Sequence, residues 1–155
     1  MGVVILGRTR CPLCGQVLEP GQDVIGFPPL FDNRREAISV LSDAAVHRPC
    51  LLRSPFAERA LTVLADERDH RGRPWRCAIC GLDIVRSEDF FGLGPEAQYG
   101  EPLARYDWFQ AHRACLRTWS GTADLLAALE QVSKSDGWEG TSLDRLIAQI
   151  VDSLA

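Results

Sequence analysis

Apolar residues recur at the spacing of an amphipathic helix in three segments of the chain. These segments are residues 56–64, 125–132 and 143–154. The i, i+3, i+4, i+7 pattern places their apolar side chains on one face of each helix. Ser54 and Pro55 are a start signal for the first helix, Thr122 for the second, and Thr141 or Ser142 for the third. We expect the third helix to pack on the second half of the chain; an exposed apolar face would instead make it a docking or dimer surface.

Shorter apolar segments between the helices predict strands. Residues 17–18 and 24–27 fit one β-hairpin, and residues 82–85 and 90–93 fit another. A further strand is expected over 37–41 and 44–46 in the first half, and over 103–109 in the second. Each half thus combines a hairpin, a further strand and a helix, and the predicted fold class is α+β.

The two halves of the chain are copies of one unit. A shift of 66 positions matches Cys11, Cys14 and Gly15 to Cys77, Cys80 and Gly81, and a shift of 65 matches His47 and Cys50 to His112 and Cys115. An internal repeat of this kind indicates duplicated supersecondary structure. We therefore predict two domains, residues 1–72 and 73–155, joined by a highly charged segment. The last predicted helix has no counterpart in the first half and extends the second domain.

Composition places the chain among folded proteins without attraction for polyanions. It has 155 residues, 46% of them hydrophobic, and a formal net charge of −4. An acidic protein has no general attraction for nucleic acid or for anionic membranes. No apolar run approaches the length of a membrane span, and the first residues lack the apolar region of a signal peptide. The expectation is a cytoplasmic protein, where cysteine thiols stay reduced and paired cysteines more often bind metal.

The cysteine and histidine residues form the strongest chemical signal. Each half carries a Cys-x-x-Cys pair and a His-x-x-Cys pair, and zinc prefers four tetrahedral ligands of these types. The predicted ligand sets are Cys11, Cys14, His47 and Cys50, and Cys77, Cys80, His112 and Cys115. Six cysteines divide into two sets of three, which predicts two structural Zn²⁺ ions. The alternatives are disulfides or buried structural thiols, and ligand pairs that cross between the two halves.

These motifs resemble those of known zinc fingers. A Cys-x-x-Cys turn, a hairpin and a second ligand pair on a helix resemble the treble-clef fingers, and the tandem pattern resembles the first zinc site of LIM domains, repeated. The chain departs from LIM domains in its longer internal loops and in having no second site directly after Cys50. The resemblance covers about three-quarters of the chain. It implies two treble-clef units, each with a zinc knuckle, a β-hairpin and a helix, followed by C-terminal helices.

The ligand count argues against catalysis. A catalytic zinc keeps one position open for water, whereas each set here has four protein donors. HNH-type nucleases also use a treble-clef scaffold, but they need further histidines, and His70 is the one histidine outside the two sets. Its charged neighbours indicate a solvated surface residue rather than a general base. The expectation is a protein that is not an enzyme and has no catalytic residues.

Two classes of partner remain. The first is a protein, bound by an interaction module that acts as an adaptor, an inhibitor or a scaffold subunit. The second is a nucleic acid, bound by a local patch of arginine and aromatic residues. The candidates for that patch are Arg8, Arg10, Arg34, Arg35, Arg48, Arg53, Arg71, Arg73 and Arg76, with Trp75, Trp108 and Phe109. Acidic residues lie among these arginines, which favours solvated ion pairs, and the acidic total favours the protein partner.

Overall fold

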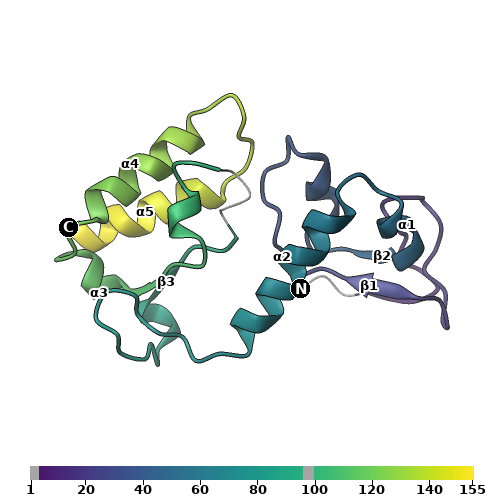
Figure 1. Cartoon of the computed structure of the whole chain (residues 1–155), viewed down its shortest axis with the longest axis horizontal. Helices are drawn as coiled ribbons and strands as arrows, with labels where there is room; N and C mark the ends of the chain where they lie inside the picture. Colours follow the sequence, from purple (N-terminus) through teal and green to yellow (C-terminus); the bar gives the residue numbers. More distant parts are fainter. Residues whose placement is uncertain (1–3, 96–99) are drawn as a thin grey trace. The chain divides into compact units, whose positions relative to one another are not determined.

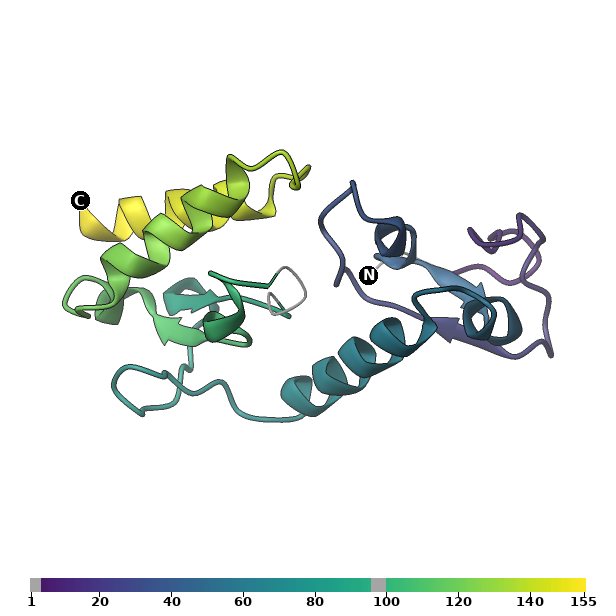
Figure 2. The same ribbon diagram turned by 45° about the horizontal axis from the view of Figure 1, so that its top comes forward.

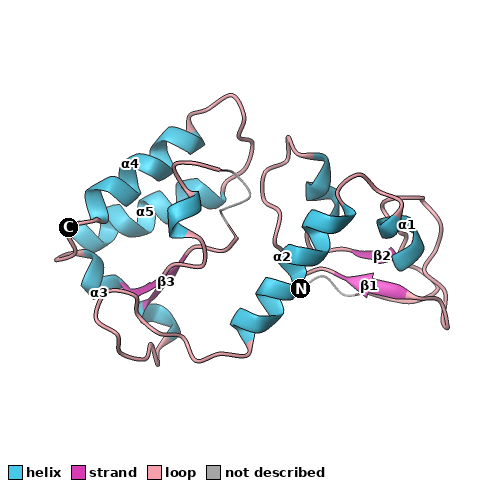
Figure 3. Ribbon diagram, viewed as in Figure 1, coloured by secondary structure: helices cyan, strands magenta, loops and turns pink. Residues whose placement is uncertain are grey.

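The computed structural model of the protein describes residues 4–95 and 100–155 (Figure 1). The chain divides into two compact units, the first covering Met1–Arg68 and the second Asp69–Ala155. Both contain short strands and helices, so the predicted α+β class is confirmed (Figure 3). Within the described residues no helix has the length and apolar character needed to cross a membrane.

The first unit is built around a two-stranded antiparallel sheet. Its elements are β1 (Val24–Gly26), the 3₁₀ helix η1 (Ala37–Leu41), β2 (Ala45–His47), α1 (Arg48–Leu52) and most of α2 (Ala57–Arg71). Strand β1 pairs with β2, and Ile25 lies opposite Val46. Helix α1 follows β2 without a loop, because Pro49 occupies its first turn, where a missing N–H costs nothing. This junction places the end of a strand and the start of a helix at one point.

The second unit repeats this arrangement and adds one further helix at its end. Its elements are η2 (Ser87–Asp89), β3 (Phe90–Gly92), η4 (Ala104–Tyr106), β4 (Gln110–His112), α3 (Arg113–Leu116), α4 (Thr122–Ser133) and α5 (Ser142–Leu154). Strand β3 pairs antiparallel with β4. Helices α4 and α5 lie side by side (Figure 2). Leu143 and Ile150 of α5 are fully buried, so the expected packing of this helix on the second half is confirmed.

The predicted hairpins are wrong in their pairing. Strand β1 pairs with β2 rather than with residues 17–18, and β3 pairs with β4 rather than with residues 82–85. Val17 instead forms a bridge with Arg10, and Asp83 with Arg76, so these segments close the Cys-x-x-Cys turns. The backbone groups that the predicted hairpins needed are already used, since each turn folds back on its own flanking residues.

Two of the predicted strands are also wrong. Residues 37–41 form η1, and residues 104–106 of the predicted strand 103–109 form η4. The buried residues Ile38 and Leu41 are three apart, as are Leu103 and Tyr106. This is the spacing of a 3₁₀ turn, which a short apolar run does not distinguish from a strand. The expected strand at residues 44–46 agrees with β2 to within one residue.

The helices are where the sequence predicts them, but the predicted side-chain caps do not form. Helix α4 starts at Thr122, whose hydroxyl donates to the Leu116 carbonyl instead of capping the helix. Thr141 precedes α5 without a side-chain cap, and the Ser54 hydroxyl donates to the Leu51 carbonyl ahead of α2. Apolar burial therefore determines these helices more than end signals do.

Each unit has its own hydrophobic core, and each core includes one cysteine. Cys11 is fully buried beside Leu18 and Val46, and Cys77 is 1% exposed in the core that holds Phe91. The other four cysteines are half-buried or exposed. The cysteine pairs therefore lie at the edge of each core, with one sulfur directed inward.

Candidate metal centres

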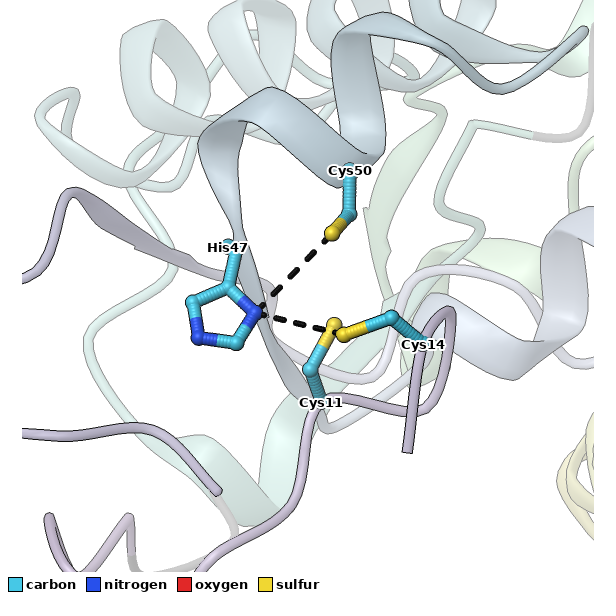
Figure 4. Close-up of side chains that lie close together, drawn as sticks. All are labelled: Cys11, Cys14, His47 and Cys50. Atoms are coloured by element: carbon cyan, nitrogen blue, oxygen red, sulfur yellow. Dashed lines mark hydrogen bonds between the residues drawn. The ribbon is translucent and has the colours of Figure 1, made fainter. Parts of the chain in front are cut away.

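The structure brings the first predicted ligand set to one point. Cys11 and Cys14 come from the turn before β1, His47 ends β2, and Cys50 lies in α1, so two distant segments meet here (Figure 4). The donor atoms of the four residues all lie within 4.8 Å of one another, and the group could hold a metal ion. We call this group the first cluster.

The second predicted set forms an equivalent second cluster. Cys77 and Cys80 lie on the turn before β3, His112 ends β4, and Cys115 lies in α3, again with all donor atoms within 4.8 Å. Each cluster lies wholly within its own unit, so the ligand pairs do not cross between units. All eight residues predicted from the sequence are in these two groups, and the six thiols are free of disulfides.

The donor spacing fits a tetrahedral zinc ion. Zinc–sulfur bonds of about 2.3 Å and zinc–nitrogen bonds of about 2.0 Å place a sulfur and a nitrogen ligand about 3.6 Å apart. His47 Nδ1 lies 3.5 Å from Cys14 Sγ and 3.9 Å from Cys50 Sγ. His112 Nδ1 lies 3.5 Å from Cys80 Sγ and 3.8 Å from Cys115 Sγ. The four donors in each cluster are therefore spaced as the ligands of one ion.

A tight turn shapes the first half of each cluster. Gly15 and Gly81 have φ angles of +73° and +74°, which glycine adopts without steric cost, and each amide donates to the carbonyl of the first cysteine. In the second cluster the His112 amide lies 3.4 Å from Cys77 Sγ and donates to it. The glycine closes the turn, and a backbone N–H group from the end of β4 points at the sulfur, which favours the thiolate form.

These backbone donors lower the pKa of the inner thiols. Burial alone would raise the pKa of Cys11, but N–H groups of His47, Leu13 and Cys14 bring it down to about 7. The same balance lowers the pKa of Cys77 to about 6. The backbone donors therefore favour the thiolate form of both sulfurs, which is the form that binds a cation.

The helix-borne thiols show the opposite shift. Burial, followed by hydrogen bonding to Cys80 and Cys77 and by their negative charge, raises the pKa of Cys115 to about 12. Burial and the neighbouring sulfurs raise the pKa of Cys50 in the same way. Three thiolates at this spacing repel one another, and a divalent cation among them removes that repulsion. The donor chemistry of each cluster therefore fits a metal ion better than it fits free thiols.

A second layer of contacts fixes the orientation of each histidine. His112 Nε2 lies 3.3 Å from the Asp83 carbonyl oxygen, which can only accept, so Nε2 donates and the lone pair on Nδ1 faces the sulfurs. His47 Nε2 donates to Gln22 Oε1 at 2.9 Å, with the same consequence. Partners of this kind hold the tautomer that binds a metal. The sequence does not reveal them, because one is a backbone carbonyl and the other depends on how the loop after Glu19 folds.

The first cluster borders an open cavity of about 740 Å³. Cys14, His47 and Cys50 all line it, together with Arg10 and Arg53. The outer edge of this cluster is therefore accessible to small molecules, although Cys11 is buried.

The remaining histidine lies apart from both clusters. The His70 ring stacks on Trp108, with ring centroids 4.3 Å apart and planes 8° from parallel. Trp108 has a φ of +54°, as does Asp43, its counterpart at a shift of 65. His70 is thus part of an aromatic contact in the second unit.

Several members of the hypothetical nucleic-acid patch have partners within the chain. Arg10 donates to the Gly15 carbonyl and Arg76 to the Gly81 carbonyl, which are matched contacts in the two units. Arg48 pairs with Asp23 at 3.1 Å. Such contacts are those of a solvated face with local ion pairs.

The aromatic candidates for that patch also have neighbours. Trp75 packs on Phe90 with centroids 4.7 Å apart, and Phe109 stacks on Trp119 at 5.1 Å. Trp75 keeps 41% of its surface exposed. A base-stacking surface would need these rings to be presented to solvent. Phe109 instead packs against the second core, and Trp108 stacks on His70.

Comparison with models of protein families, with curated proteins and with solved structures finds no match. The class of protein is therefore defined by the fold and the clusters themselves. The chain is a small α+β protein with two Cys₃His groups that could each hold a metal ion.

Proposed function

We propose that the protein is a non-enzymatic zinc-binding module that interacts with a protein partner. Two structural zinc ions hold its two units in a folded state, and the folded units present the binding surface. The observation that carries this proposal is the closed donor set, in which four protein ligands converge in each cluster. An adaptor, an inhibitor and a scaffold subunit of a larger cytoplasmic assembly all fit this description.

Zinc is the proposed ion because of the donor types. Three thiolates and an imidazole are a common ligand set of structural zinc, whereas harder cations prefer oxygen. The order of turn, short antiparallel sheet and helix-borne second pair supports a treble-clef, LIM-like unit. In both copies the second pair spans the junction from strand to helix, β2 to α1 and β4 to α3.

The same closed set supports a role without catalysis. Water activation needs an open coordination position, and four protein donors leave none. His70, the histidine outside both clusters, stacks on Trp108. Function is then expected on the surfaces that the metal centres hold in place.

A difference between the two copies supports a protein partner. Leu82 is 66% exposed and Val85 is 89% exposed on the loop after the second Cys-x-x-Cys turn. The corresponding positions in the first unit are the polar residues Gln16 and Glu19. Exposed apolar side chains at these two positions are a candidate contact surface for an apolar patch on another protein.

We expect the double variant Leu82→Gln and Val85→Glu, which copies the first unit, to lose the partner and keep its zinc. The zinc-loaded chain would be immobilised, bound proteins from its native host identified, and each purified protein tested for direct binding. Leu52→Gln is the matched control, because Leu52 is a 58% exposed apolar residue of the first unit. Unchanged binding by the double variant would contradict the proposed surface. Tight binding to DNA or RNA at physiological salt would favour the nucleic-acid alternative instead.

A further inference from the structure

The two clusters have the same ligands but different neighbours. Arg53, three residues after Cys50, donates from Nη2 to Cys50 Sγ at 3.6 Å. The corresponding residue in the second unit is Thr118, whose hydroxyl lies 3.5 Å from the Cys115 carbonyl and donates there rather than to sulfur. The other matched arginines, Arg10 and Arg76, make the same contact in both units and do not distinguish the clusters.

A guanidinium beside a thiolate changes the chemistry of the whole cluster. Three thiolates, a neutral imidazole and a zinc ion carry a net charge of about −1. The positive charge of Arg53 offsets this charge in the first cluster, and its N–H group occupies a lone pair of Cys50. A sulfur whose lone pair and charge are held in this way is a weaker nucleophile.

The first cluster is not shielded from small electrophiles by burial. Its three outer ligands line the open cavity, so a small electrophile can reach Cys14 and Cys50. The exposed sulfurs Cys14 and Cys80 also hold equivalent places in the two turns. A difference that acts directly on a ligand sulfur is the guanidinium N–H group of Arg53 on Cys50 Sγ.

We infer that the two metal centres are chemically unequal: the second cluster is a modification site for soft alkylating electrophiles, and Arg53 protects the first. This inference rests on the zinc occupancy proposed above. With a haloacetamide, a thiolate sulfur of the second cluster attacks the CH₂ carbon, a sulfur–carbon bond forms, and the halide leaves with the bonding electron pair. The resulting neutral thioether has lost the thiolate charge that binds zinc, so the ion is released.

The test uses the full zinc-loaded chain and iodoacetamide. Zinc release is followed with a colorimetric indicator, and peptide mass spectrometry identifies the alkylated cysteines over time. We expect release in two phases, with the accessible sulfurs Cys80 and Cys115 modified on the order of tenfold faster than Cys14 and Cys50. Arg53→Thr should bring the first cluster to the faster rate, and Thr118→Arg should slow the second. Arg53→Lys, which keeps the charge without the fixed fork of donors, should fall between.

Equal rates in the two clusters, or faster alkylation of the first, would overturn the inference. If Arg53→Thr fails to fold, two other results still decide the inference. These are the order in which the two clusters of the chain without substitutions are alkylated, and the effect of Thr118→Arg. The zinc content measured before alkylation separates the two proposals. Two ions released at one rate would contradict only the inequality, whereas absence of zinc would contradict the proposed function.

Discussion

Removal of zinc is expected to unfold both units. Each sheet has only two strands of three residues, and one cysteine of each cluster is buried in the neighbouring core. Units of this size bury a small core, and a structural metal commonly supplies the missing stability. Zinc binding contributes about 10–16 kcal/mol in zinc-finger peptides, which is comparable to the whole stability of about 5–15 kcal/mol of an ordinary domain. Loss of the ion should therefore abolish the fold rather than weaken it.

The measurement is circular dichroism and tryptophan fluorescence during titration with a strong chelator under reducing conditions. All four tryptophans lie between residues 75 and 138, so their emission reports the second unit alone. Circular dichroism reports helices of both units. Addition of zinc should restore both signals. A chain that keeps its helical signal and its tryptophan emission without metal would show that the hydrophobic cores stabilise the fold without zinc, which contradicts this prediction.

Substitution of a single ligand is expected to unfold one unit and leave the other intact. Cys77→Ser should shift the tryptophan emission to that of exposed indole and reduce the zinc content to one ion. Cys11→Ser should also cost one ion and part of the helical signal, but leave the tryptophan emission unchanged. The reason is that each cluster and each core lies within its own unit. The stability lost should equal most of that of the affected unit.

Ala78→Ser is a matched control, because it introduces the same side chain at an exposed position next to Cys77. We expect it to keep two ions and to change the free energy of unfolding by less than about 0.5 kcal/mol. Unfolding of both units by either cysteine variant would contradict the independence of the two centres.

The two clusters could be predicted from the sequence because their members are residue types at fixed spacing. A pair three residues apart lies on one turn in either a tight loop or a helix start, so Cys11 and Cys14 needed no knowledge of the fold to be matched with His47 and Cys50. The repeat strengthened this prediction, since the same four positions occur twice. The helices were predictable for a similar reason, because α5 keeps its apolar spacing over its whole length.

Strand pairing could not be predicted in the same way. Strands of three residues carry too few side chains to show alternation, and Leu18, which is fully buried, belongs to the segment that closes the Cys-x-x-Cys turn rather than to a hairpin. The contacts around the ligands depend on tertiary structure as well. The Asp83 carbonyl is a backbone group, and Arg53 is one arginine among many until its guanidinium is found beside Cys50.

Zinc content is the most direct test of the account. The purified chain, dialysed against metal-free buffer, would be measured by elemental analysis together with its protein concentration. The two four-donor clusters predict about two zinc ions per chain. A value of zero or one, in protein shown to be folded by circular dichroism, would contradict the claim that both units are held by structural zinc.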